Sequence, residues 1–215
     1  SSGQAAPTFQ SSPRENQVMY SVFWFFLPLL GSSALRGLAA PLPCPGNSTA
    51  DDILKGIDLS GKVAIVTGGD SGLGYAAADA LARAGATVVI AYHNQTSGEH
   101  AAKVIANSTG ATVHALPINL GNLASVRSFV EKFLAVAGPT LHLLINDAGI
   151  EGPSILSGDG YELVFQVDYL GHFLLTELLL PALRSSRPSR VVNVASGAHE
   201  NACEAAGWQE NCFKD

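Results

Sequence analysis

The sequence predicts an α/β fold built on a doubly wound parallel sheet, and three observations lead to this prediction. Short apolar runs recur along the chain, as expected for parallel strands that are covered on both faces. Segments with helical periodicity alternate with these runs. The first run, at 62–67, leads directly into a loop with glycines at 68, 69, 72 and 74. Strand, glycine loop and helix in this order favour a nucleotide-binding unit.

The glycine loop lies in the segment GKVAIVTGGDSGLG, residues 61–74. Its spacing differs from the commoner G-x-G-x-x-G fingerprint, so the loop alone is a weak signal. The following helix, YAAADALARAGA, is closed by Gly85, and TVVIAY supplies a second strand. Glycines let the backbone approach a pyrophosphate closely, and the start of a helix offers free N–H groups and a positive dipole end. The segment therefore predicts a phosphate-binding βαβ unit.

The remaining elements follow in regular alternation. We expect a helix over 97–108 capped by Ser97, a strand in TVHALPINL that ends near Asn119, and strands in LHLLIN and RVVNVAS. A further helix begins near residue 123, and its predicted core face consists of Leu123, Val126, Phe129, Val130, Phe133 and Leu134. Asp159 and Glu162 form an N-cap pair that opens a long apolar helix to about Leu183. That helix is too apolar for a solvated surface, which suggests packing on the sheet or a homodimer.

Composition limits the classes of function. The chain has 215 residues, 47% hydrophobic content and a net charge of −6, enough for one sizeable domain. Without a cluster of Lys or Arg, the sequence gives no footprint for nucleic acid. Cys44, Cys203 and Cys212 have no metal-binding spacing. A Cys203–Cys212 disulfide is one alternative, and free thiols are the expectation.

The N-terminal part predicts a leader followed by a linker. Residues 1–18 are polar, and translation from the only methionine, Met19, would leave them out. Residues 19–40 indicate either a signal peptide or a short membrane anchor, 41–58 a linker, and 59–215 the dinucleotide-binding domain. The predicted location is the endoplasmic reticulum membrane or the secretory pathway, and the alternative is the cytoplasm.

Four segments in order resemble the short-chain dehydrogenase/reductase family, and most closely its retinol dehydrogenase-like branch. They are TGGDSGLG at 67–74, NDAG at 146–149, FQVDYLGHFLLT at 165–176 and RVVNVAS at 190–196. The resemblance implies a Rossmann-type fold that binds NAD or NADP and transfers hydride between the nicotinamide and a small alcohol or carbonyl substrate, which could be lipid-like. It assigns catalytic positions to Ser196 and Asp168. The implied cofactor-binding residues are Gly68, Asp70, Ser71, Gly72, Leu73, Gly74, His93, Asn119, Leu120, Asn146, Ala148 and Gly149.

The cofactor preference depends on the residues after the second strand. A carboxylate there would bind the ribose 2′-hydroxyl and repel a 2′-phosphate. The chain has Tyr92, His93 and Asn94 instead, and His93 aligns with an arginine that favours NADP in related enzymes. We therefore expect NADP, with NAD as the alternative, and no metal.

Several positions depart from the family pattern. Asp168 replaces a usual asparagine, Asp147 replaces the second asparagine of NNAG, and Asn119 replaces a common aspartate. All five tyrosines precede Ser196, whereas the family's catalytic Tyr-x3-Lys pair follows that serine. We expect a chain truncated at the C-terminus that binds nucleotide poorly and does not catalyse, from an active parent oxidoreductase. The alternative is a non-catalytic nucleotide-binding or interaction protein on the same fold.

Overall fold

The computed structural model describes residues 48–196. The predicted leader, the start of the linker and all three cysteines lie outside this part of the chain. Within it, five parallel strands form one sheet with the order β3-β2-β1-β4-β5. The strands are β1 (Val63–Thr67), β2 (Thr87–Tyr92), β3 (Val113–Pro117), β4 (Leu143–Asn146) and β5 (Arg190–Asn193). The doubly wound α/β prediction is confirmed.

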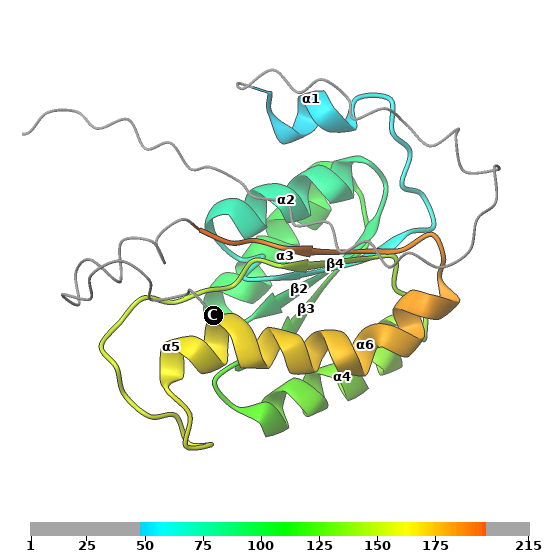
Figure 1. The fold of residues 1–215 in the computed structure, drawn as a ribbon. Helices are drawn as coiled ribbons and strands as arrows, with labels where there is room; N and C mark the ends of the chain where they lie inside the picture. Colours follow the sequence, from blue (N-terminus) through cyan, green and yellow to red (C-terminus); the bar gives the residue numbers. More distant parts are fainter. Residues whose placement is uncertain (1–47, 197–215) are drawn as a thin grey trace, which may run out of the picture. The chain divides into compact units, whose positions relative to one another are not determined.

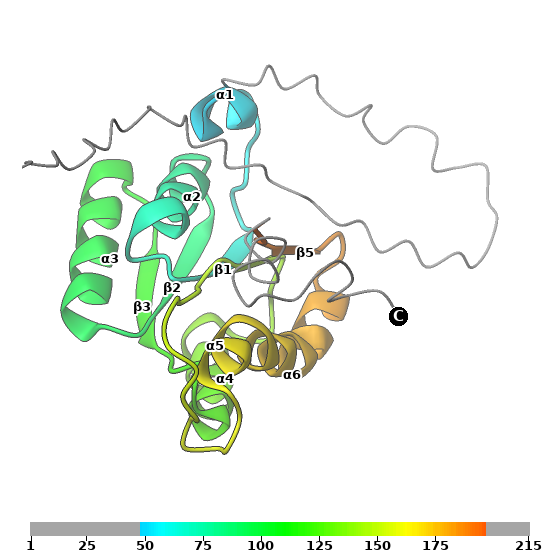
Figure 2. The ribbon, with the colours of Figure 1, turned by 60° about the vertical axis from the view of Figure 1, so that its left-hand side comes forward.

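Helices cover both faces of this sheet (Figures 1 and 2). The helices α2 (Gly72–Arg83) and α3 (Gln95–Thr109) pack on one face, and α4 (Leu123–Ala137) and α6 (Gly171–Ser185) on the other. Successive strand residues point to opposite faces, so Ile65 joins the core under α4 and α6 while Ala64 and Val66 join the core under α2 and α3. Burial on both sides explains the continuous apolar runs in the sequence.

The predicted linker contains a short helix, α1 (Ala50–Leu54), which the sequence pattern did not indicate. Thr49 begins it with a capping box, because its side chain accepts the Asp52 N–H while the Asp52 carboxylate accepts the Thr49 N–H. The helix α3 begins at Gln95, whereas the sequence predicted a start at Ser97. Asn94 is the N-cap, since its Oδ1 accepts the N–H groups of residues 96 and 97.

The long helical stretch begins later than predicted. Glu162 caps α5 (Leu163–Phe165) by accepting the Phe165 N–H at 2.7 Å, and a π-helical turn, η1 (Gln166–Leu170), leads into α6. Asp159 does not cap this helix, because its carboxylate accepts the Leu123 N–H at 2.8 Å and so joins the loop to the start of α4. Hydrogen bonds from the Leu123 N–H and from the Gln166 side chain lower the Asp159 pKa, and the Leu123 N–H contributes most.

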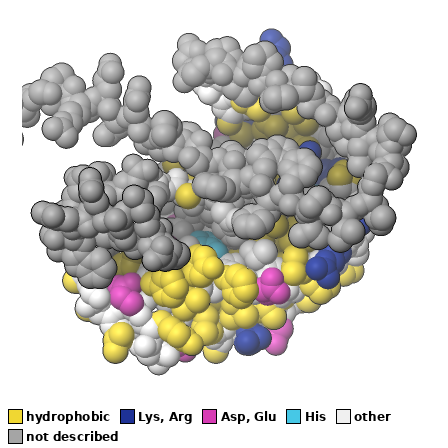
Figure 3. Space-filling model, in the orientation of Figure 1, with side chains coloured by type: hydrophobic (Ala, Val, Ile, Leu, Met, Phe, Trp, Pro, Cys, Tyr) yellow, Lys and Arg dark blue, Asp and Glu magenta, His cyan; other side chains and the backbone are white. Residues whose placement is uncertain are grey.

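Apolar side chains are also exposed at two places on these helices. Leu134 was predicted to face the core of α4, but its side chain is 43% exposed. On the other helix, Phe165, Tyr169 and Phe173 stack in a row and stay more than half exposed. Figure 3 shows hydrophobic side chains gathered over the α5 and α6 region. The homodimer remains a prediction.

The stretch 163–185 is also long and apolar enough to cross a membrane. Its Leu175, Leu179 and Leu183 are buried in the core that α4 shares, which is the position of a structural helix in a globular domain. The membrane prediction concerned residues 19–40, which lie outside the described part.

Candidate nucleotide-binding site

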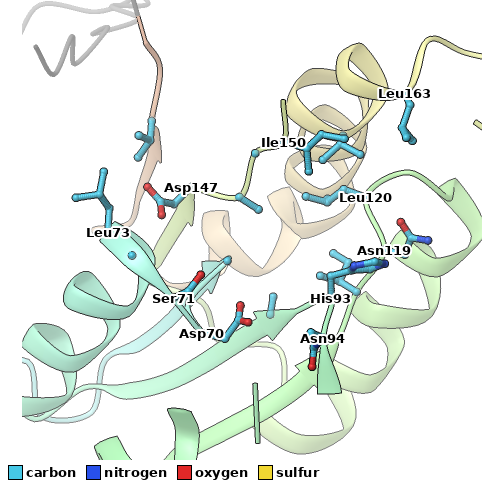
Figure 4. A pocket seen from close by; sticks show the side chains of 18 residues that line it. Asp70, Ser71, Leu73, His93, Asn94, Asn119, Leu120, Asp147, Ile150 and Leu163 are labelled. Atoms are coloured by element: carbon cyan, nitrogen blue, oxygen red, sulfur yellow. The ribbon is translucent and has the colours of Figure 1, made fainter. Parts of the chain in front are cut away.

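A pocket of about 650 Å³ lies at the carboxyl ends of the central strands (Figure 4). This is where a doubly wound sheet binds its ligand, between the loops that follow neighbouring strands. Most of the predicted cofactor-binding residues line the pocket: Gly68, Asp70, Ser71, Gly72, Leu73, His93, Asn119, Leu120, Ala148 and Gly149. The structure therefore brings together loops that follow β1, β2, β3 and β4.

Glycine is required in the loop after β1 for two different reasons. Gly68 has φ +65, a left-handed conformation, and a Cβ there would lie 3.1 Å from the Ala148 Cα. Gly74 lies in the first turn of α2, where a Cβ would approach the Gly68 carbonyl oxygen to 2.4 Å. The loop thus folds tightly against the segment after β4, which leaves the backbone itself as the pocket wall.

The start of α2 offers donors to an anion. Ser71 is the N-cap and its side chain makes no capping bond. Among residues 48–196, no hydrogen bond uses the N–H of Gly72 or Leu73, and both residues line the pocket. Free N–H groups at a helix N-terminus favour phosphate, and the dipole adds to the effect. The loop therefore fits the pyrophosphate of a dinucleotide.

Thr67, the last residue of β1, connects this loop to the segment after β4. Its Oγ1 accepts the N–H of Asp147 at 2.9 Å and of Ala148 at 3.0 Å. His172 Nε2, from α6, lies 2.9 Å from the same oxygen. The buried hydroxyl thus fixes the pocket wall at 147–149 against both the sheet and α6.

Asp147 brings a carboxylate to the glycine end of the pocket. Its Oδ2 lies close to Gly74, because a Cβ on Gly74 would come within 2.8 Å of it. Burial raises the pKa of this carboxyl, and the Gly74 N–H offsets part of that increase. The sequence marked position 147 as unusual but did not place it among the binding residues.

The opposite wall of the pocket follows β2 and β3. Asp70 accepts the Ser97 hydroxyl at 2.5 Å, which ties the glycine loop to α3. His93 and Asn94 line the pocket beside it. Asn119 turns its Oδ1 to the Gly121 N–H at 2.9 Å. Among the described residues that line the pocket, only His93 can carry a positive charge.

Four predicted site residues lie outside this lining, namely Gly74, Asn146, Asp168 and Ser196. Gly74 stands behind the loop, and Asn146 bonds Thr176 and Asn193 through its Nδ2 at 3.1 and 2.8 Å. Asn146 therefore joins β4 to β5 and α6, while its buried Oδ1 has no partner among the described residues. Asp168, in the π-helical turn, accepts the Ile150 N–H at 3.0 Å and lies against Gly149. Burial is the largest cause that raises the Asp168 pKa.

Ser196, the other predicted catalytic residue, follows β5 and is exposed. It lies beyond Val194, the last residue of the compact unit that holds the pocket. Sequence reasoning missed the apolar floor of the pocket, which includes Ile118, Ile150, Leu163 and Val167. No local signal marks Leu163 and Val167, because their place depends on how α5 and η1 fold over the sheet, whereas Ile118 and Ile150 adjoin the predicted strand-end residues.

The sheet order and the pocket together define a dinucleotide-binding α/β protein. The model of the short chain dehydrogenase family matches residues 62–207, and the chain belongs to this family. The four ordered motifs lie within that range, so the predicted family is confirmed.

Known relatives agree with this membership. The chain is 46% identical over 156 residues to WW domain-containing oxidoreductase of Gallus gallus, with 72% of this chain and 37% of the relative covered. It is 44% identical over 145 residues to retinol dehydrogenase 12 of Mus musculus, with 66% and 46% covered, which supports the retinol dehydrogenase-like branch. The chain thus spans less than half the length of these two relatives.

A solved structure shows the same fold. The Pseudomonas aeruginosa RhlG/NADP active-site complex is 30% identical, with a TM-score of 0.54 over 62% of this chain and 54% of that one.

Proposed function

We propose that this chain is the cofactor-holding part of an NADP-dependent oxidoreductase. The observation that carries the proposal is the glycine loop, whose free N–H groups at Gly72 and Leu73 line the pocket. The similarity to the RhlG/NADP complex supports the choice of cofactor. When bound, the nicotinamide would supply or accept the hydride.

Each wall of the pocket has a role in this proposal. The loop after β1 holds the pyrophosphate through its backbone, and Gly149 lets the nicotinamide half approach the strand ends closely. Asn119 and Leu120 lie where the adenine would be held. His93, which replaces a carboxylate at the end of β2, leaves room for a 2′-phosphate and favours NADP over NAD.

The substrate is an alcohol or carbonyl compound, and the similarity to a retinol dehydrogenase supports a lipid-like one. Hydride transfer to a carbonyl leaves negative charge on oxygen, which needs a hydrogen-bond donor and a proton. Ser196 would donate the hydrogen bond. Asp168 would take the place of the usual asparagine, and its ionised form can accept but not donate.

Proton transfer is the step for which this chain has no evident residue. In the family the proton comes from a tyrosine that follows the serine, and no tyrosine follows Ser196 among the 215 residues of this chain. The alternative function is a non-catalytic nucleotide-binding protein, which Asp147 and Asp168 favour because both place carboxylates where the family has neutral amides. In either case the pocket binds nucleotide.

The experiment compares two variants of the full chain. Ser71→Asp keeps a good N-cap but adds a carboxylate beside the pyrophosphate donors, and Ser108→Asp adds the same charge at the exposed end of α3. NADPH binding is followed by fluorescence and calorimetry, and turnover with an aldehyde panel. We expect binding by the unmodified chain, at least about tenfold weaker binding by Ser71→Asp, and no change in Ser108→Asp.

Two outcomes would overturn the proposal. The pocket assignment fails if a folded, unmodified chain binds no dinucleotide, or if both variants bind equally. NADPH oxidation with any aldehyde of the panel would exclude the non-catalytic alternative.

A further inference from the structure

The glycine end of the pocket presents negative charge to a ligand that is itself an anion. Asp147 and Asp70 both line it, and among the lining residues only His93 can be positive. Figure 4 shows Asp147 on the side of Leu73, opposite Asp70. An ionised carboxylate at this place opposes a pyrophosphate that the helix N-terminus attracts.

Asp147 also lies beside the donors that an anion needs. Its carboxylate is close to Gly74, in the first turn of α2 next to the free N–H groups of Gly72 and Leu73. Asp147 is held there because its own N–H donates to the Thr67 hydroxyl at 2.9 Å. The backbone of Asp147 is therefore held at the wall of the pocket.

We propose that Asp147 is a proton-controlled gate for the cofactor: the ionised carboxylate opposes the pyrophosphate, and its protonation lets a dinucleotide bind more tightly. This inference rests on the proposed function, because it concerns the same pocket. An asparagine would have nearly the same shape without the charge. Asp147→Asn is therefore the variant that removes only the gate.

The direction of the pH effect follows from the geometry and from the carboxyl's environment. Burial raises the pKa of Asp147, so its proton is available at higher pH than for an exposed aspartate. A bound pyrophosphate raises that pKa further, so binding takes up protons. By linkage, dinucleotide affinity increases as the pH falls.

The pH effect of Asp147 has to be distinguished from the effects of the other titratable groups around it. The elements packed about it carry Asp70, Tyr75, His93, Glu151, Asp168 and His172. His93 is the strongest competitor, because its protonation would also attract an anion. His172 is buried, and the Thr67 hydroxyl connects it to the Asp147 N–H.

The ligand for the test is NAD⁺. A 2′-phosphate, as in NADP⁺, has a second pKa of about 6 and would itself titrate, whereas a pyrophosphate diester does not. Calorimetry on the full chain measures the Kd at about pH 5.5 and about pH 8, on either side of the histidine range. Adenosine, which has no phosphate, is the control ligand.

We expect NAD⁺ to bind the unmodified chain more tightly at the lower pH than at the higher pH. Asp147→Asn should bind more tightly than the unmodified chain at the higher pH, and its affinity should depend less on pH. His93→Gln and Asp70→Asn should keep the pH dependence. Adenosine affinity should not change with pH.

Proton uptake gives a second readout that needs no variant. Titrations of the unmodified chain in two buffers of different ionisation enthalpy should show protons taken up on NAD⁺ binding. Equal Kd values at both pH values, without uptake and without an effect of Asp147→Asn, would overturn the gate and leave the proposed function intact. Absence of NAD⁺ and NADP⁺ binding by every folded variant at both pH values would overturn both.

Discussion

The side chains of Thr67 and His172 meet 2.9 Å apart in the buried space between β1 and α6. Two backbone N–H groups donate to the Thr67 oxygen, and its hydroxyl also lies 3.5 Å from the Ile145 carbonyl oxygen. On the other side of the ring, the His172 Nδ1 faces the Asp168 carbonyl oxygen at 3.3 Å. The motif threonine and the helix histidine thus form one unit that supports the pocket.

Removal of the Thr67 hydroxyl should destabilise the fold. Thr67→Val keeps the shape but leaves the N–H groups of Asp147 and Ala148 and the His172 ring without their partner. We expect a loss of about 1–3 kcal/mol in the free energy of unfolding, measured by urea denaturation. Thr67→Ser keeps the oxygen and should lose clearly less. Equal losses in the two variants would show that the hydroxyl does not support this segment.

His172 should make the protein less stable in acid. Burial lowers the pKa of His172 from 6.5, so the unfolded chain binds a proton there at a higher pH than the folded chain does. The stability is therefore complete above about pH 6.5 and is lost as the pH falls below that value. His172→Gln should flatten this part of the curve of unfolding free energy against pH. The same slope in both proteins would contradict a neutral, buried His172.

A methyl group at Gly74 should disturb the glycine loop. Gly74→Ala brings a Cβ within 2.4 Å of the Gly68 carbonyl oxygen, so the helix or the loop has to move. We expect a cost of about 1–3 kcal/mol, as for other overpacked sites, together with weaker dinucleotide binding. Gly158→Ala is the control, because a Cβ there meets nothing within 4 Å. Thermal unfolding compares the stability of the two variants, and equal melting temperatures would refute the close packing at Gly74.

The position of His93 should decide between the two dinucleotides. His93→Asp places a carboxylate after β2, where it would repel a 2′-phosphate and accept a ribose hydroxyl. We expect NADP⁺ binding to weaken about tenfold while NAD⁺ binding changes little. His100→Asp makes the same change on the exposed face of α3, outside the pocket, and should alter neither. Parallel loss of both dinucleotides in His93→Asp would mean that the 2′-phosphate does not lie there.

The fold could be predicted because its signals are local. Buried parallel strands give unbroken apolar runs, and the turn after β1 needs glycine at Gly68 whatever the rest of the chain does. Helix starts were less predictable, since Asn94 and Ser97 are both good caps and only the contact of Ser97 with Asp70 assigns Ser97 another role.

The site could be predicted only in part, for a related reason. Residues directly after strands, such as His93 and Asn119, were found because every parallel sheet brings these positions together. Asp159 was misassigned because its partner, the Leu123 N–H, is distant in sequence. The position of the Asp147 carboxylate at Gly74 depends on two loops that meet only in the folded chain.

The most direct test of the central claim is to observe the backbone amides of the glycine loop while NADP⁺ is added to the full ¹⁵N-labelled chain. We predict that the amide signals of Gly72, Leu73 and Gly149 shift saturably with one common Kd. The signals of Gly110 and Gly138, which end α3 and α4 outside the pocket, should stay in place. Saturable shifts that leave out Gly72 and Leu73, or no shifts in a folded chain, would contradict a pyrophosphate site at the start of α2.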